Sequence, residues 1–311
     1  MAGPSLVTGG NGFAGSHLIE HLLAFEPALA AWSRPGGVQP EDEQRVHWRR
    51  VDVLDRADVA AAIAELRPAV IYHCAGAADV GGSWSNPAVP LRVNALGTHH
   101  VLDGVRLAGL ACTVLVTGSA LVYRPSLEAL TEASAIGPTS PYGLSKLAQE
   151  MVAARATWCP TLLTRSFNHV GPRQSPAYAT SNFARQIAEI EAGIREPVIR
   201  VGNLDSRRDI SDVRDTVRAY RALVERGRPG VPYNVCCGRA YRVGDLLDVL
   251  LGLARVAVSV ERDPRLMRPS DNPVLLGDPS RIAADTGWQP VIPIERTLSD
   301  LLEFWRRRAG A

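Results

Sequence analysis

A tyrosine and a lysine four residues apart form the part of this sequence best suited to acid–base chemistry. Tyr142 and Lys146 lie in the segment SPYGLSK, and Lys146 is the only lysine among the 34 lysine and arginine residues. A spacing of four places both side chains on one face of a helix. A tyrosine hydroxyl titrates at roughly pH 10, and a neighbouring ammonium lowers that pKa by favouring the phenolate. The pair predicts a tyrosine that exchanges protons near neutral pH, although a single lysine could also fall at this position by chance.

A glycine-rich turn near the start of the chain predicts a phosphate-binding site. Its sequence is GGNGFAG, with Gly9, Gly12 and Gly15 at intervals of three and Phe13 inside the turn. It follows the first predicted strand and opens the first predicted helix. In that context the glycines allow the backbone to approach a pyrophosphate, which then faces the helix N-terminus. We therefore expect these four residues to bind a dinucleotide cofactor.

The ends of the second and third predicted strands bear on which dinucleotide is bound. NAD-binding sheets usually carry an acid after the second strand, but this segment reads AWSRP and has none. Ser33 and Arg34 could instead hold the 2′-phosphate of NADP, or Arg34 could be a solvated loop residue. Asp52, which precedes Val53, is placed to bond an adenine amino group or to cap a turn. NADP(H) is the expected cofactor, with NAD(H) as the alternative.

The first half of the chain alternates apolar runs with amphipathic stretches. The predicted strands are 4–8, 28–33, 46–53, 69–75, 112–119 and 161–167, and the predicted helices are 16–24, 55–66, 87–107 and 141–156. This alternation predicts a Rossmann-type doubly wound parallel sheet, an α/β fold with helices on both faces. Further helices are expected at 182–192, at 243–253 and within 290–305.

A change in texture at about residue 168 predicts a second, smaller α/β lobe. Loops become longer and Pro, Gly and Arg more frequent after this point. The expected division is an NAD(P)-binding domain of residues 1–167 plus about 209–235, and a ligand-binding lobe of about 168–208 and 236–311. A family resemblance, carried by motifs along the whole chain, implies that the ligand of the second lobe is a nucleotide sugar.

Composition and cysteine usage argue against several classes of protein. Hydrophobic residues make up 46%, charged residues 21% and the formal net charge is +2, which gives no case for a nucleic-acid or membrane surface. The five cysteines have neither zinc-ligand spacing nor the pattern of a disulfide framework, so no metal site is expected. The sequence also shows no signal peptide or membrane-length apolar run. We therefore expect a cytoplasmic protein.

Several motifs together resemble the extended short-chain dehydrogenase/reductase family. The glycine turn and the Tyr142/Lys146 pair are accompanied by HCAG at 73–76 and by Asn94 in the segment VNALGT. The second-half segments SFNHVGPRQ, VGNLDSRRDISDVRD, YNVCCG and RLMRPSD resemble the GDP-sugar branch of this family. The likeness covers nearly the whole chain.

The resemblance implies roles for individual residues. Ser119, four residues before Tyr123, takes the place of the family's third catalytic residue beside Tyr142 and Lys146. The further cofactor contacts that it implies are Val53, Ala75, Gly76 and Asn94, with the Lys146 ammonium at the nicotinamide ribose. The substrate contacts that it implies are Ser83, Asn168, Arg208, Arg268 and Asp271.

The resemblance also implies an activity. The leading expectation is reduction of the C4 ketone of a nucleotide-diphosphate 4-keto-6-deoxyhexose, with GDP-4-keto-6-deoxy-D-mannose giving GDP-D-rhamnose. Dehydratases of this branch carry one or two acids after the catalytic serine, whereas Ala120 and Leu121 follow Ser119 here, so loss of water is not expected. A thymidine-diphosphate sugar is an alternative substrate.

The same residues are compatible with two other functions, and the resemblance also implies an oligomeric state. An NAD-dependent nucleotide-sugar 4-epimerase would use the same three residues, and a non-catalytic NADP-binding sensor would use only the cofactor site. The resemblance implies a homodimer through a four-helix contact built from the helices predicted at 87–107 and 141–156.

Overall fold

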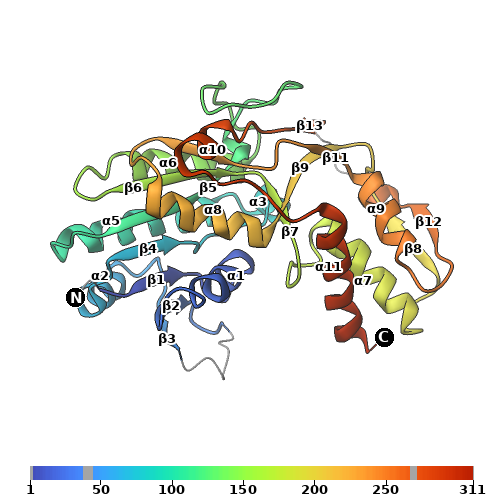
Figure 1. The fold of residues 1–311 in the computed structure, drawn as a ribbon, viewed down its shortest axis with the longest axis horizontal. Helices are drawn as coiled ribbons and strands as arrows, with labels where there is room; N and C mark the ends of the chain where they lie inside the picture. Colours follow the sequence, from blue (N-terminus) through green and yellow to red (C-terminus); the bar gives the residue numbers. More distant parts are fainter. Residues whose placement is uncertain (1–2, 38–44, 267–271, 311) are drawn as a thin grey trace.

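A sheet of seven parallel strands organises the larger part of the molecule, which the computed structural model describes for residues 3–37, 45–266 and 272–310 (Figure 1). The strand order is β10-β6-β5-β4-β1-β2-β3. The strands are β1 (Ser5–Thr8), β2 (Leu29–Ser33), β3 (Val46–Arg50), β4 (Val70–His73), β5 (Thr113–Ser119), β6 (Thr161–Ser166) and β10 (Pro232–Val235). The order reverses between β1 and β4, and sheets of this kind bind ligands beyond the carboxyl ends of their strands at that point.

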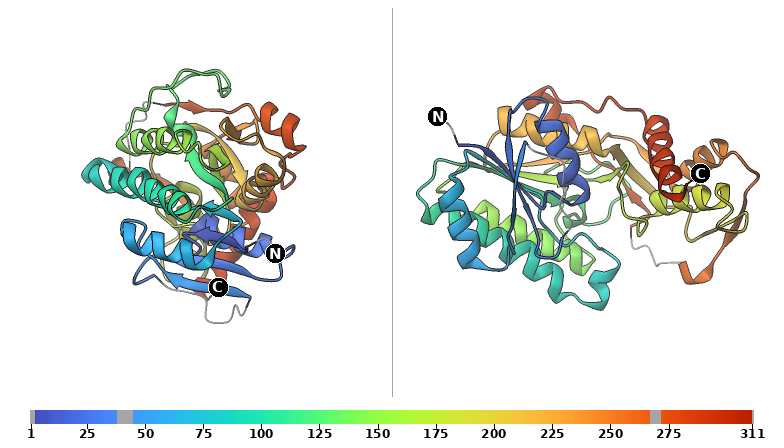
Figure 2. Two further views of the ribbon diagram at one scale, coloured as in Figure 1. Left: turned by 90° about the vertical axis from the view of Figure 1, so that its left-hand side faces the viewer. Right: turned by 90° about the horizontal axis from the view of Figure 1, so that it is seen from below.

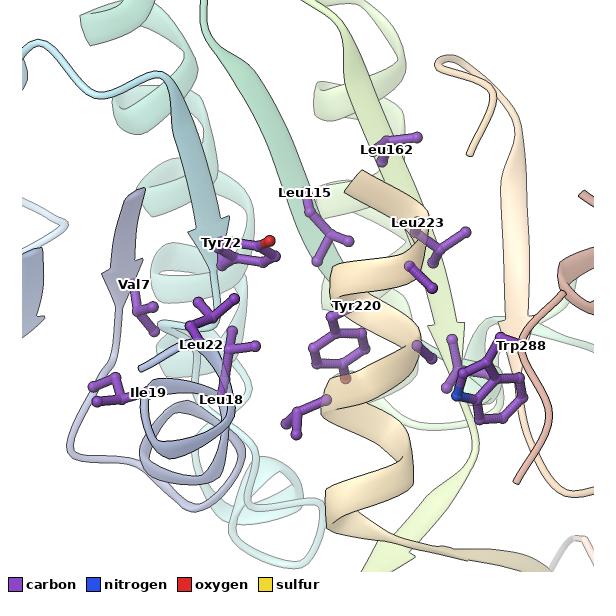
Figure 3. Packing of buried hydrophobic residues seen from close by; sticks show 14 of the residues in the cluster. Val7, Leu18, Ile19, Leu22, Tyr72, Leu115, Leu162, Tyr220, Leu223 and Trp288 are labelled. Atoms are coloured by element: carbon purple, nitrogen blue, oxygen red, sulfur yellow. The ribbon is translucent and has the colours of Figure 1, made fainter. Parts of the chain in front are cut away.

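Helices cover both faces of this sheet, which is why every residue of β1, β2 and β6 is buried. One face carries α1 (Phe13–Leu22), α8 (Val213–Arg226) and α10 (Ser280–Thr286); the other carries α2 (Arg56–Leu66), α5 (Gly97–Leu107) and α6 (Pro141–Ala154). Figure 3 shows the first face, where Tyr72 of β4 lies near Leu18 and Leu22 of α1 and Tyr220 of α8 fills the adjoining space. The predicted Rossmann-type fold is confirmed.

Local sequence explains where two of the helices on the second face of the sheet begin. Ser140 caps α6, because its hydroxyl accepts a hydrogen bond from the Gly143 N–H, and Pro141 suits the first helical position. Asp55 caps α2, because its side chain accepts from the N–H groups of Ala57 and Asp58.

The single helix predicted at 87–107 is three consecutive helical segments. These are α4 (Ala88–Pro90), a π-helical turn η1 (Leu91–Leu96) and α5. The π turn contains Asn94, and such turns are frequent at functional sites because they re-aim a side chain.

The second lobe has its own core and smaller sheets (Figure 2). Its strands are β7 (Asn168–Val170), β8 (Val198–Val201), β9 (Arg207–Asp212), β11 (Ala240–Arg242), β12 (Ser259–Arg262) and β13 (Val274–Leu275). Its helices are α7 (Ala179–Glu191), α9 (Val243–Gly252) and α11 (Ile294–Ala309), and the 3-10 turn η3 (Pro264–Leu266) follows β12. The short helix α3 (Gly82–Ser85) and the 3-10 turn η2 (Ala120–Val122) belong to the larger part of the molecule. Apolar side chains of α7, α9 and α11 pack together as this lobe's core.

One segment departs from the predicted division of the chain. Residues 280–288, assigned from sequence to the second lobe, pack on the large sheet, where α10 contacts α8 and β10. Ile282 and Trp288 enter the first core cluster because burying them there removes their apolar surface from water. Within the described ranges, no helix has the length and apolarity needed to cross a membrane.

Candidate active site

A cavity of about 380 Å³ lies at the carboxyl ends of the strands and is lined by residues of both lobes. The glycine turn, the end of β5 and the start of α6 supply one wall, and residues 168, 169, 174, 175 and 178 supply another. A second cavity of about 230 Å³ shares Asn168, His169, Gln174 and Tyr178 with the first. A ligand with two parts could therefore occupy both.

Ser119, Tyr142 and Lys146 are brought together at this cavity, as the sequence predicted. Ser119 ends β5 and caps the 3-10 turn η2, its hydroxyl accepting from the Leu121 N–H at 3.2 Å. Tyr142 and Lys146 lie in the first turns of α6. All three side chains are buried and line the cavity.

The Tyr142 hydroxyl is held in its protonated form. Burial raises the pKa of Tyr142 above its ordinary value, and a hydrogen bond with Ser119 lowers it in part. The sequence-based expectation was that Lys146 would lower this pKa, but Lys146 is not among the influences on Tyr142 in the structure. Desolvation is the largest influence on this pKa, and the Lys146 Nζ lies 6.0 Å from the centre of the Tyr142 ring.

Lys146 is directed by two oxygen acceptors. Its Nζ donates to the Thr117 carbonyl at 2.9 Å and to the Gln149 Oε1 at 2.8 Å. Burial lowers the pKa of Lys146 to about 8. The ammonium is therefore the major form at neutral pH, and it is lost within the range in which enzymes are commonly assayed.

Asn94 and Gly76 shape the wall beside Lys146. The Asn94 Oδ1 accepts from the Ala77 N–H at 2.8 Å, and its Nδ2 donates to the Ser145 hydroxyl at 2.8 Å. A Cβ added at Gly76 would lie 2.9 Å from the Asn94 Oδ1 and 3.5 Å from the Lys146 Nζ. Asn94 thus fastens the segment after β4 to α6, and a side chain at position 76 would press on the Asn94 amide that makes this link.

The glycine turn has the geometry that a pyrophosphate requires. Gly9 has φ +65°, and a Cβ there would lie 2.7 Å from the Ala75 Cα. A Cβ on Gly15 would collide with the Gly9 carbonyl oxygen. Helix α1 then begins at Phe13 with no side-chain cap and no acid in its first turn. The N-terminal end of α1 and the cavity it lines therefore fit an anionic cofactor.

The residues predicted at the adenosine end of the cofactor lie at the ends of β2 and β3. Ser33 ends β2 and is buried, and Arg34 follows it in an exposed position. Asp52 accepts from the Leu54 N–H at 2.9 Å and so caps a turn in this structure, while the Val53 carbonyl accepts from His100. Their contacts to a cofactor stay predictions.

The predicted substrate residues are only partly brought together. Asn168 lines both cavities and Arg208 lines the second, where burial lowers the pKa of its guanidinium. Ser83 lines neither cavity, and its hydroxyl donates to the Val80 carbonyl at 2.7 Å. Arg268 and Asp271 lie outside the described residues.

Sequence reasoning missed a buried polar cluster behind Lys146. Its members Thr8, His73, Thr98 and Gln149 are all fully buried. Only the spacing of three between Lys146 and Gln149 hinted at a contact, because the other members come from separate strands and helices.

A model of the family described as GDP-mannose 4,6 dehydratase matches residues 6–301 of this chain. The chain belongs to this family. The predicted resemblance to extended short-chain dehydrogenases/reductases is thereby confirmed.

Individual relatives span almost the full length of the chain. It is 34% identical over 310 residues to a GDP-6-deoxy-D-mannose reductase of Pseudomonas aeruginosa, with 97% of each chain covered. It is 27% identical over 328 residues to a UDP-glucose 4-epimerase of Mycolicibacterium smegmatis, covering 98% of this chain and 99% of that one. The solved structure of RMD from Pseudomonas aeruginosa complexed with NADPH matches with a TM-score of 0.85 and 30% identity, covering 98% of this chain and 99% of that one.

The described lining of both cavities lacks acidic side chains. Ala120 and Leu121 follow Ser119 and line the first cavity with hydrocarbon. Among the described residues that line either cavity there is no aspartate or glutamate. In the part of the chain that the structure describes, no three His, Cys, Asp or Glu side chains gather as metal ligands either.

Proposed function

We propose that this protein is an NADPH-dependent nucleotide-sugar 4-ketoreductase that converts GDP-4-keto-6-deoxy-D-mannose to GDP-D-rhamnose. The observation that carries the proposal is a cavity that presents Ser119, Tyr142 and Lys146 without a carboxylate among its described lining residues. Removing a proton from the sugar carbon and expelling its C6 hydroxyl requires a proton-transfer group beyond this set. Reduction of a ketone requires only a hydride source and a proton donor. The 34% identical reductase from Pseudomonas aeruginosa supports the same reaction.

The protein's part in the reaction is to bind the ketone and protonate its oxygen. The Ser119 and Tyr142 hydroxyls would both donate to the C4 oxygen, so that charge developing there meets donors already in place. Tyr142 would then give up its proton. Its raised pKa suits this role, because the donor must still be protonated when the ketone binds.

The cofactor would lie along the glycine turn, with the Lys146 ammonium at the nicotinamide ribose. When bound, the reduced nicotinamide supplies the hydride for the ketone carbon. Gly9, Gly12 and Gly15 would admit the pyrophosphate, and Ser33 with Arg34 would receive a 2′-phosphate. The neighbour complexed with NADPH supports this choice over NAD(H), which stays the alternative cofactor.

The second lobe would hold the nucleotide diphosphate. Arg208 lines the smaller cavity, and an anionic diphosphate would offset the cost of burying its guanidinium. Asn168 lies where the two cavities meet and would contact the sugar or the first phosphate. Arg268 and Asp271 remain proposed contacts to the nucleotide.

We also propose a homodimer and a cytoplasmic location. Leu96 and Leu107 in η1 and α5, and Leu144 and Met151 in α6, are exposed apolar residues on two helices that contact each other. The spacing of each pair places its two members on one helix face. All five cysteines are free thiols, which suits a reducing compartment.

An assay with defined nucleotide sugars tests the proposed activity. The protein is supplied with GDP-4-keto-6-deoxy-D-mannose or its dTDP counterpart, with NADPH or NADH, while nicotinamide absorbance is followed and the product is identified by NMR. We expect consumption of NADPH that matches the GDP-D-rhamnose formed. We expect Tyr142→Phe to lower kcat by about 100- to 10,000-fold while NADPH still binds.

The rival functions give different results in the same assay. Protein that purifies with one equivalent of NAD and consumes no added NADPH would be an epimerase. A biological role that survives Tyr142→Phe would indicate a sensor. Equal kcat/KM with NADH and NADPH would contradict the assignment of Ser33 and Arg34.

A further inference from the structure

The buried cluster behind Lys146 is a continuous set of hydrogen bonds that ends at the glycine turn. The Lys146 Nζ donates to the Gln149 Oε1 at 2.8 Å, and the Gln149 Nε2 donates to the Thr98 hydroxyl at 2.8 Å. The Thr98 hydroxyl also contacts the His73 Nε2 at 3.0 Å, and the His73 Nδ1 contacts the Thr8 hydroxyl at 2.8 Å. Thr8 immediately precedes Gly9.

The donor and the acceptor of each hydrogen bond in this cluster follow from the Asn94 carbonyl, which can only accept. The Thr98 hydroxyl donates to the Asn94 carbonyl at 2.7 Å, so it accepts from both Gln149 and His73. His73 therefore carries its proton on Nε2, and its Nδ1 accepts from the Thr8 hydroxyl. With the Gln149 amide nitrogen committed to Thr98, only its oxygen can face Lys146.

Lys146 is the one charged group in these surroundings near neutral pH. The titratable side chains that face it are Tyr142 on its own helix, His73 at the end of β4 and Cys74 directly after that strand. Burial keeps all three neutral, since it raises the pKa of Tyr142, lowers that of His73 to about 3 and raises that of Cys74 to about 12. Within the described residues no carboxylate pairs with Lys146, and the hydrogen-bond acceptors that its ammonium meets are the oxygens of Gln149 and Thr117.

We propose that Gln149 is a positioning residue, whose amide oxygen, fixed by the Thr98–His73–Thr8 chain, orients the Lys146 ammonium and keeps it charged. A glutamine that merely filled space would need no particular orientation of its amide. Here both ends of the amide are used, and both partners are buried. Gln149 is not among the residues that line either cavity, so it would act through Lys146.

The single lysine in the sequence makes this inference directly measurable. Protein grown with lysine labelled with ¹³C at Cε gives one side-chain resonance, and its titration reports the Lys146 pKa without any assay of activity. The wild-type value is expected at about 8. Gln149→Met removes the acceptor at nearly constant volume, and should lower the pKa by about one unit or more.

A second substitution is expected to act in the opposite direction. Gln149→Glu places a carboxylate beside the ammonium and should raise the Lys146 pKa by about one unit or more. This variant also keeps the inference testable if the methionine variant fails to fold. Gln186→Met is the matched control, because Gln186 is a buried glutamine of α7 with bonds at both ends of its amide. It should leave the resonance unchanged.

Turnover supplies the second readout, which rests on the proposed reductase activity. In Gln149→Met, kcat should be below the wild-type value already at pH 6, where orientation alone is lost, and should fall further behind it up to pH 8.5, while KM for the sugar stays the same. If the protein shows no reductase activity but the Lys146 pKa shifts as expected, the proposed function is contradicted and this inference still holds. Identical Lys146 titrations in wild type and both Gln149 variants would overturn the inference.

Discussion

Lys146 is buried where the structure offers hydrogen-bond acceptors to two of the three N–H groups of its ammonium. These acceptors are the Thr117 carbonyl and the Gln149 Oε1. A guanidinium carries five N–H donors on a plane, so several would be buried without acceptors. We expect Lys146→Arg to fold but to lose about 100-fold in kcat, because the charge is kept while its position changes. Arg155→Lys is the control, because it exchanges the same two residue types in the opposite direction at the exposed end of α6. This variant should keep the wild-type kcat. Near-normal turnover in Lys146→Arg would make the solitary lysine a coincidence of composition.

The same residues show how far sequence reasoning reaches at this scale. The spacing of Tyr142 and Lys146 was sufficient to predict that both lie on one helix, and motif resemblance added Ser119 to the candidate site. The partners of Lys146 could not be found in this way, because they depend on strand register: β1 and β4 pair with Thr8 opposite His73. The balance of forces on Tyr142 was also out of reach, since the degree of burial that raises its pKa is a property of the folded chain.

Strands β1 and β4 and helix α5 meet at His73. Protonation of this buried histidine should therefore make the free energy of unfolding depend on pH. Burial, reinforced by Lys146, lowers the pKa of His73 to about 3. The unfolded chain binds a proton at this residue below roughly pH 6.5 while the folded chain does not, so stability falls as pH decreases from that value. Between pH 6.5 and 5 the share of His73 is about 2 kcal/mol. Urea unfolding at pH 6.5 and at pH 5 should show this loss of stability in the wild-type protein. Between the same two pH values, His73→Gln should lose about 2 kcal/mol less stability than the wild type. Burial also lowers the pKa of His17, His21 and His169, so the comparison with the variant isolates the effect of His73. Equal losses in both proteins would contradict it.

The sequence predicted which segments are helices or strands better than it predicted irregular turns and short helices. Apolar periodicity indicated a helix over 87–107, but the π turn at Leu91–Leu96 depends on Asn94 reaching Ala77 and Ser145 across the fold. Helix α10 was missed for a related reason. Its seven residues are too few for a clear amphipathic pattern, and its burial is decided by α8 and β10.

The two lobes of the molecule are joined by contacts that no local pattern could indicate. Phe13 of α1 stacks on His169, with ring centres 5.7 Å apart, and the His17 Nε2 donates to the Pro172 carbonyl at 2.8 Å. Arg173, with φ +73°, forms an ion pair with Glu20. Residues about 150 positions apart therefore hold the loop after β7 against the helix that would bind the cofactor phosphates. Because the loop also lines both cavities through Gln174, cofactor and substrate sites share one support.

The exposed apolar face of η1, α5 and α6 leads to a prediction about assembly. Met151 is 63% exposed on α6, two turns from Leu144 on the same face. In a four-helix contact between two copies, a charge at this position would be desolvated and would disfavour association. Met151→Glu should therefore shift the protein from dimer to monomer in sedimentation velocity. Ile194→Glu, at a residue 65% exposed in the second lobe, should leave the dimer intact. Turnover per protomer should change little, because the residues proposed to react all come from one chain. A monomeric wild-type protein, or a Met151→Glu variant that stays dimeric, would show that this face has another use.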